Sequence, residues 1–203
     1  LEDRDGWSKV WESRMSQPIT LPARNICGPM LSDGDVQIPS AESLGLIRTD
    51  RVSQLQGGES DGLRVLESFA MGRGSRYQSE MSSPNTAFDS CSRLSPYLTW
   101  GCLSMRTAVQ RIRAAAGDTL PKTAARAFLS RCHWHCHFIQ KLESEPAIEF
   151  CAFNRACETL RDNGNDPARL EAWQQARTGY PFVDACMRAL KPVSYTHLRA
   201  HET

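Results

Sequence analysis

Residues 131–138 read RCHWHCHF and lie in the longest helical pattern of the chain, which covers 121–143. The stretch contains two cysteines and three histidines, which raises the question of a metal site. At about 100° per residue, four potential ligands share one arc of this helix. They are Cys132, His133, Cys136 and His137. Ligands on one straight helix approach an ion from one side and cannot complete a tetrahedron around zinc. No other stretch offers ligand spacing, so we predict no metal ligand here, but inert buried thiols and histidines on a polar surface.

The opposite arc of the same helix combines aromatic and basic side chains. Its members are Phe128, Arg131, Trp134, His135 and Phe138. Rings interleaved with cations suit a flat anionic ligand such as a nucleotide or a flavin. A stripe of aromatic core residues, from which Arg131 extends to solvent, explains the pattern equally well. The helix taken alone leaves both interpretations open.

Outward from this helix, the rest of the chain after residue 58 is also helical in pattern. The predicted helices cover 59–72, 96–100, 104–116, 153–162, 167–176 and 181–190. Ser104 is the expected N-cap of the third, and Pro167 lies in the first turn of the fifth. No segment alternates as a strand does, so we predict an all-α fold.

The chain before residue 59 has a different character. Residues 1–15 have helical spacing, whereas 17–58 are rich in Pro, Gly, Ser and Asp and predict a long connector with one short helical turn capped by Ser40. So long a connector is unusual inside a compact domain and indicates that two bodies are joined.

Composition indicates an ordinary globular protein. The chain has 203 residues, of which 40% are hydrophobic, and a net charge of +1. Residues 106–141 are strongly basic, which fits either an anionic partner or a helix face whose acidic complement lies elsewhere in the fold. The eight cysteines include no CxxC pair, and no apolar run is long enough for a signal peptide or a membrane span. We expect reduced thiols and a cytoplasmic monomer that binds no membrane.

Two further segments carry local signals. In CSRLSPYLTWGCLS, residues 91–104, Ser95 and Pro96 form an N-cap and first-turn pair with Arg93 just upstream, which predicts a phosphate cradle at a helix entrance. Ser-Pro pairs also begin many helices that bind nothing. In RTGYPFVDACMRAL, residues 177–190, a turn enters a helix whose apolar spacing indicates core packing.

Taken together and in order, these segments resemble the DNA photolyase and cryptochrome family. The resemblance is carried by SRLSPYL at 92–98, by the aromatic-rich helix with Trp134, and by LEAWQQARTGYPFVDACMRAL at 170–190. The stretches IPSAESLGL at 38–46 and RYQSEMSSPNTAFDS at 76–90 are similar to one bacterial branch of the family. DRDGWSKVWESRM at 3–15 resembles the tail of its antenna domain.

The resemblance implies a two-domain flavoprotein with an α/β antenna domain, a long linker and a helical domain that holds FAD. In these terms, residues 1–16 are the tail of the antenna domain, 17–58 the interdomain linker and 59–192 the first half of the helical FAD-binding domain. Residues 193–203, VSYTHLRAHET, can be back-translated into an adapter of transposon-based sequencing libraries, so we expect them to be an artefact and the chain to be a fragment.

The resemblance also implies site residues. The flavin nucleotide is expected to contact Tyr77, Cys91, Ser92, Arg93, Leu94, Ser95, Phe128 and His135, and the DNA lesion is expected to contact Arg131, Trp134 and Phe138. Cys91 stands where the family often has Thr, and Arg131 where dimer photolyases usually have Glu. A guanidinium only donates hydrogen bonds, so Arg131 cannot make the carboxylate's contact with the lesion.

The function implied is light-driven repair, in which excited reduced FAD passes an electron to a pyrimidine dimer in damaged DNA. The resemblance places an antenna chromophore in the missing α/β domain and the electron-transfer residues in the missing C-terminal part, so the truncated chain itself is expected to be inactive. A cryptochrome photoreceptor without repair activity shares the fold and the cofactor. From another class, a helical metal- or nucleic-acid-binding module would use the Cys and His arc of 131–138.

Overall fold

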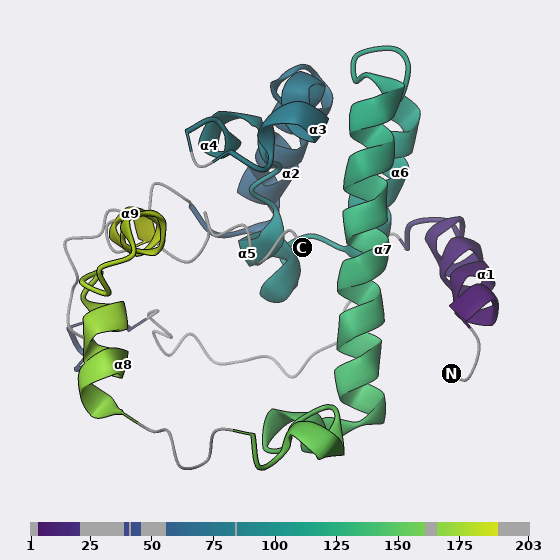
Figure 1. Cartoon of the computed structure of the whole chain (residues 1–203). Helices are drawn as coiled ribbons and strands as arrows, with labels where there is room; N and C mark the ends of the chain where they lie inside the picture. The colour runs from purple at the N-terminus through teal and green to yellow at the C-terminus, as the bar shows by residue number, and fades with distance from the viewer. Residues whose placement is uncertain are drawn as a thin grey trace.

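Helix α7, Lys122–Ser144, is the long axis against which much of the chain packs (Figure 1). The computed structural model describes residues 4–20, 39–40, 42–45, 56–83, 85–160 and 166–190. This part of the chain contains helices and turns but no strand, and its only ladder-type pairing is one isolated bridge between Ala116 and Leu120. The all-α prediction is confirmed.

Helix α6, Met105–Ala115, forms a hairpin with α7. Ser104 caps α6 as predicted, since its Oγ accepts a hydrogen bond from the Thr107 amide at 3.0 Å. In the connecting turn, the amide of Gly117 donates to the carbonyl of Leu120 at 2.8 Å. Gly117 has φ +89°, a left-handed conformation that favours glycine, and Pro121 then takes the N-cap position of α7.

The core lies where α2, Glu59–Ala70, meets α6 and α7. The side chains at its centre are at most 4% exposed and come from all three helices and the hairpin turn. They are Leu66, Phe69, Val109, Ile112, Leu120 and Phe128. Burying one such side chain contributes about 1.5–3 kcal/mol, so this cluster is the main source of stability for the helical body.

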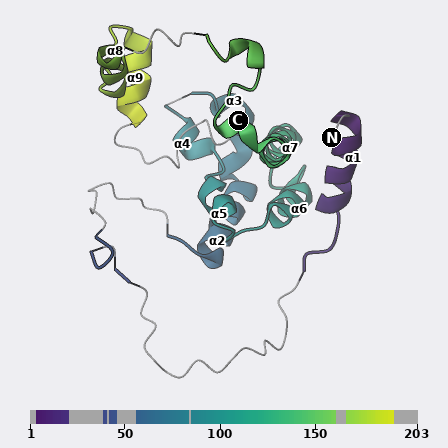
Figure 2. The same ribbon diagram turned by 90° about the horizontal axis from the view of Figure 1, so that it is seen from below.

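Helix α1, Arg4–Met15, belongs to the same core. Trp7 and Trp11 are each 5% exposed, and α1 lies beside α6 and α7 in both views (Figures 1 and 2). The guanidinium of Arg106 on α6 donates to the carbonyls of Arg14 at 3.0 Å and Pro18 at 3.1 Å, which fastens the end of α1.

Short helices connect α2 to α6 along the sequence. They are η1 (Arg73–Arg76), α3 (Tyr77–Glu80), α4 (Ala87–Ser90) and α5 (Ser95–Thr99). Those between residues 73 and 90 were not expected from the sequence, because each is too short to show a periodic apolar face. They are held by tertiary contacts instead, and Tyr77 of α3 is fully buried against α7.

After α7 the chain forms η2 (Pro146–Glu149), η3 (Arg155–Cys157), α8 (Pro167–Gln174) and α9 (Pro181–Leu190). Helices α8 and α9 pair with each other and lie apart from α7 in both views (Figures 1 and 2). The predicted helix at 153–162 is wrong over its described residues: only the single turn of η3 forms, capped by Asn154. Residues 153–160 are all exposed, so no buried face drives a longer helix, and 161–165 lie outside the described residues.

The other predicted helices after residue 58 agree with α2, α5, α6, α7, α8 and α9 to within two residues at each end. The expected turn near Ser40 also forms, and the amide of Ser43 donates to the Ser40 Oγ at 3.1 Å. No helix in the described ranges is both long and apolar enough to cross a membrane.

Candidate functional site

An aromatic cluster at the junction of α2, α3 and α7 unites two of the predicted flavin contacts. The rings of Tyr77 and Phe128 have centroids 6.2 Å apart. Phe69 of α2 packs against both, at 5.4 Å from Tyr77 and 5.1 Å from Phe128. All three rings are at most 4% exposed, so they form a rigid base beneath this part of the site.

The segment 91–95 adjoins this cluster. Ser92 and Leu94 are buried, and Ser92 Oγ accepts a hydrogen bond from the Leu94 amide at 3.4 Å. The guanidinium of Arg73 donates to the carbonyls of Cys91 and Ser92 and lies 5.6 Å from the centroid of the Phe69 ring. The structure therefore brings Tyr77, Phe128 and the start of the 91–95 segment together around Phe69 and Arg73.

The phosphate cradle expected at Ser95 differs in the structure. Leu94 occupies the N-cap position without a side-chain cap, and Ser95 is the first residue of α5 instead of its N-cap. Arg93 has φ +60°, and its Nε donates to the Phe88 carbonyl at 2.8 Å while the guanidinium lies over the Phe88 ring. The Arg93 side chain is thus directed to Phe88 of α4.

Farther along α7, the three predicted DNA contacts share one face. The rings of Trp134 and Phe138 stack with centroids 5.6 Å apart and an interplanar angle of 27°. They are 39% and 55% exposed, so the stacked pair presents ring surface to solvent. Arg131 lies one turn before Trp134 and is half-buried, and no Asp or Glu of the described ranges forms an ion pair with it.

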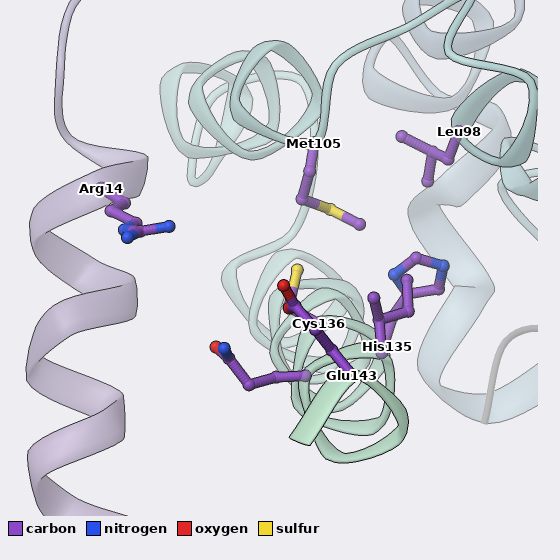
Figure 3. Close-up of a pocket in the computed structure, with 8 residues that line it drawn as sticks. Arg14, Leu98, Met105, His135, Cys136 and Glu143 are labelled. Carbon is purple, nitrogen blue, oxygen red and sulfur yellow. The ribbon is translucent and has the colours of Figure 1, made fainter. Parts of the chain in front are cut away.

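His135 follows Trp134 in sequence but points into a different environment. It lines an open pocket of about 310 Å³ between α1, α5, α6 and α7 (Figure 3). The lining residues are Arg14, Leu98, Met105, His135, Cys136, Ile139, Gln140 and Glu143. The helical rotation of about 100° per residue separates the two side chains, so α7 presents His135 to the pocket and Trp134 to the outside.

The remaining Cys and His residues of RCHWHCHF face α1. His133 lies between two indoles, with centroids 4.3 Å from Trp7 and 5.1 Å from Trp11, and its Nε2 is 3.2 Å from Ser8 Oγ. His137 contacts Trp7 at 5.3 Å. The prediction that both histidines lie on a polar surface is therefore wrong, because α1 covers them.

The two thiols on this arc are partly or fully buried. Cys132 is 4% exposed, and burial raises the pKa of the Cys136 thiol while the Trp11 indole N–H opposes that rise. Within the described ranges, no three His, Cys, Asp or Glu side chains gather as metal ligands would.

Some basic side chains of the segment 106–141 form ion pairs with acidic side chains of the fold. Arg111 pairs with Glu67 at 2.5 Å and lowers the pKa of that carboxyl, Arg113 pairs with Glu12 at 2.6 Å, and Lys141 pairs with Glu145 at 2.6 Å. Three further cations on α7 form no ion pair among the described residues. They are Lys122, Arg126 and Arg131. The acidic complement is therefore found for some members of this segment, and an anionic partner for the others stays a prediction.

The segment 177–190 is organised by Asp184. Its carboxylate accepts hydrogen bonds from the Thr178 amide at 2.8 Å, the Thr178 hydroxyl at 2.7 Å and the Gly179 amide at 3.1 Å. These donors lower the pKa of Asp184, the Thr178 hydroxyl most strongly. The turn into α9 is thereby fixed by a side chain that apolar spacing did not single out.

Two residues at the centre of the site formed by α2, α3 and the 91–95 segment were not identified from the sequence. Phe69 reads as an ordinary core residue of α2, and Arg73 lies in RGSR, which reads as a turn. Neither segment has a pattern that distinguishes it from many others, so only the three-dimensional contacts reveal their role.

Comparisons with known proteins give one family match and several named relatives. Residues 128–203 match the sequence model of a family described as the FAD binding domain of DNA photolyase. The matched range includes residues 193–203, which lie outside the described structure. No solved protein structure matches the chain significantly.

The named relatives include both photolyases and a cryptochrome. The chain is 30% identical to a deoxyribodipyrimidine photo-lyase of Halobacterium salinarum, over 95% of this chain and 40% of that protein. It is 28% identical to a (6-4)DNA photolyase of Arabidopsis thaliana, over 81% of this chain and 30% of the relative. It is 26% identical to cryptochrome-1 of Rattus norvegicus, over 89% of this chain and 33% of the relative. The chain thus spans less than half the length of each of these relatives.

Proposed function

The chain belongs to the DNA photolyase and cryptochrome family, and from this premise we propose that it is the first half of the FAD-binding domain of a light-driven DNA repair enzyme. The reaction proposed for the whole protein is the splitting of pyrimidine dimers in damaged DNA. An antenna chromophore, if the protein carries one, would bind in the part of the relatives that this chain does not span.

The residues at the aromatic cluster have the chemistry that FAD requires. The hydroxyl groups of Ser92 and Ser95 are donors suited to a pyrophosphate, and Tyr77 and Phe128 supply an aromatic wall. The imidazole of His135, which lines the separate pocket farther along α7, is a further candidate donor. Cys91 lacks the hydroxyl that Thr would supply, although its carbonyl is held in place by Arg73. We propose that these residues hold the flavin nucleotide. When bound and reduced, FAD supplies the electron that light drives into the dimer.

The surface of α7 supports the DNA part of the proposal. A lesion in duplex DNA must leave the base stack before it can approach a buried cofactor, and exposed aromatic rings provide the stacking surface for an extruded base. Trp134 and Phe138 present such a surface, and Arg131 adds a cation that can donate to a base or to a phosphate. We propose that these three side chains contact the damaged strand.

A single observation carries the proposal: one helix presents the two candidate sites in succession. Phe128 of α7 packs in the aromatic cluster beside the 91–95 segment, and Trp134 lies less than two turns farther along on the exposed surface. At a rise of about 1.5 Å per residue, the two positions are roughly 9 Å apart along the helix axis. This spacing would set a flipped base near a cofactor held at the cluster.

The second candidate is a cryptochrome-type photoreceptor without repair activity, and Arg131 bears on the choice without deciding it. A carboxylate at this position could accept hydrogen bonds from the damaged bases, and Arg131 cannot. The named relatives include a cryptochrome as well as photolyases, so sequence similarity alone does not choose between them.

The deciding experiment is repair under blue light by the uninterrupted gene product, compared with its Arg131→Glu variant. Thymine-dimer oligonucleotides restored by the unchanged protein in light, and not in darkness, would support the repair enzyme. A protein that binds FAD but restores no dimer in either form would support the photoreceptor. A colourless protein that contains stoichiometric zinc would contradict both the repair enzyme and the photoreceptor, and it would support the metal-binding alternative.

A further inference from the structure

Arg73 connects the 91–95 segment to the core through a single guanidinium. Its Nε donates to Ser68 Oγ at 3.1 Å, and its terminal nitrogens donate to the carbonyl oxygens of Cys91, of Ser92 at 2.9 Å and of Val65 at 3.3 Å. Two of these acceptors belong to α2 and two to the segment that precedes α5. The side chain therefore joins α2 to a segment that follows η1, α3 and α4 in the sequence.

The base on which Arg73 rests is rigid. Its guanidinium lies over Phe69, which packs against Tyr77 and Phe128. Gly74, the next residue, is buried so close to Phe69 that an added Cβ would lie 2.6 Å from the ring. The turn that carries Arg73 can thus approach the ring only because residue 74 has no side chain.

The contacts of Arg73 determine how the segment is oriented. In a planar trans peptide, the N–H of a residue points away from the carbonyl of the residue before it, and the described residues include no cis peptide. Because the carbonyls of Cys91 and Ser92 point to Arg73, the amides of Ser92 and Arg93 point to the other side. Arg93 then has φ +60°, a conformation that a non-glycine residue rarely adopts without such support.

We propose that Arg73 is the positioning residue of the Cys91–Ser95 segment, which it holds in the orientation that receives the phosphate groups of the flavin nucleotide. The identity of the ligand rests on the function proposed above. The orienting role of Arg73 does not depend on that ligand, because it is argued from hydrogen bonds within the chain. These two parts can be tested separately.

The first test is hydrogen exchange by mass spectrometry on the 203-residue chain without ligand. Arg73→Gln removes the fork of donors, whereas Arg73→Lys keeps the charge but replaces a planar fork by a single point of donation. The matched control is Arg76→Gln, one turn away in the same η1, whose guanidinium pairs with Glu80 at 3.0 Å and is 74% exposed.

Arg73→Gln loses hydrogen bonds from a charged donor, so peptides that cover 91–95 should exchange about tenfold faster or more than in the parent. The exchange rate in Arg73→Lys should lie between those of the parent and Arg73→Gln. Peptides of the α6–α7 hairpin should exchange as in the parent, and Arg76→Gln should change neither region. Equal exchange of 91–95 in the parent and in both Arg73 variants would overturn the proposal. If Arg73→Gln does not fold, Arg73→Lys carries the same comparison.

The second test uses the uninterrupted gene product and measures its affinity for FAD and for riboflavin, which has the same ring system without phosphate. If Arg73 orients the segment that receives the phosphate groups, Arg73→Lys should weaken FAD binding by about tenfold. Its affinity for riboflavin should stay within about twofold of the parent's. Equal losses for both ligands would show that Arg73 only supports the fold and would overturn its phosphate role. An uninterrupted parent protein that binds neither ligand would contradict the FAD assignment, and with it the phosphate role, while hydrogen exchange still decides whether Arg73 holds the segment.

Discussion

The indole of Trp7 on α1 meets the imidazole of His133 on α7 edge to face, with ring centroids 4.3 Å apart. This contact explains most of the unusual composition of RCHWHCHF. His133 and His137 pack on Trp7, Cys132 is buried, and Cys136 is partly buried near Trp11. The residues that suggest a metal site in the sequence are those that attach α1 to the helical body.

Trp7→Ala should therefore destabilise the chain strongly. Trp7 is 5% exposed, and replacing a buried Trp by Ala costs about 3–5 kcal/mol because it leaves a cavity at the α1–α7 contact. The free energy of unfolding, measured by guanidinium titration followed by circular dichroism, should fall by that amount.

Val10→Ala is the matched control for Trp7→Ala, since Val10 lies on the same helix and is 48% exposed. Its effect should stay within about 0.5 kcal/mol. A double-mutant cycle with His133→Ala should give a coupling of about 0.5–1.5 kcal/mol for the ring pair. If Trp7→Ala and Val10→Ala cost the same, α1 does not dock on α7 as described.

The helices could be predicted from the sequence because their apolar faces repeat over several turns. Helices α6 and α7 have Ser104 and Pro121 at their starts, and the predicted bounds of both agree with the structure to within one residue. The turns of 73–90 were missed because their stability comes from contacts with α2 and α7, which no local pattern records.

The candidate site could be predicted only in part for a similar reason. The identity of Tyr77, Phe128 and Trp134 as candidates came from a family resemblance, and the structure sets the first two in one cluster. The orientation of Arg93 depends on a left-handed backbone that sequence spacing does not reveal. The hold of Arg73 on the same segment depends on tertiary hydrogen bonds, which are equally invisible in the sequence.

Gly74→Ala should disturb the aromatic cluster directly. An added Cβ would lie 2.6–2.9 Å from three carbons of the Phe69 ring, which is itself fully buried and cannot move aside freely. Overpacking of this kind costs about 1–3 kcal/mol. Gly57→Ala is the control, because nothing lies within 4 Å of its added Cβ, and its stability should be unchanged or slightly higher. Equal thermal unfolding of the two variants would show that Phe69 does not pack against Gly74.

Asp184 should make the turn before α9 sensitive to acid. Its folded-state pKa lies below the unfolded value of about 3.9, so its stabilising effect is fully present above that pH. The effect is lost as pH falls through the lowered pKa, when the carboxyl becomes protonated. In an NMR titration, the Thr178 and Gly179 amide shifts should follow the carboxyl with a midpoint below pH 3.9.

Asp184→Asn is the matching variant, since it keeps the shape of the side chain but removes the negative charge. It should lower the stability of the turn at neutral pH and abolish the acid-dependent shift of both amides. Amides that titrate identically in the parent and in Asp184→Asn would show that another group causes the transition.

Trp134→Ala and Phe138→Ala should weaken DNA binding while they leave stability nearly unchanged. Each ring is substantially exposed, so little burial is lost on truncation, whereas a stacked base contributes about 1–3 kcal/mol to binding. Affinity for a single-stranded oligonucleotide should therefore fall by about fivefold to a hundredfold for each variant.

Leu142→Ala is the control, because Leu142 is 47% exposed on the same helix and has no ring on which a base can stack. If all three variants bind DNA equally well and retain the stability of the parent, the Trp134–Phe138 surface serves another partner. Selective loss in the two aromatic variants would instead establish this face of α7 as the place where an unstacked base is received.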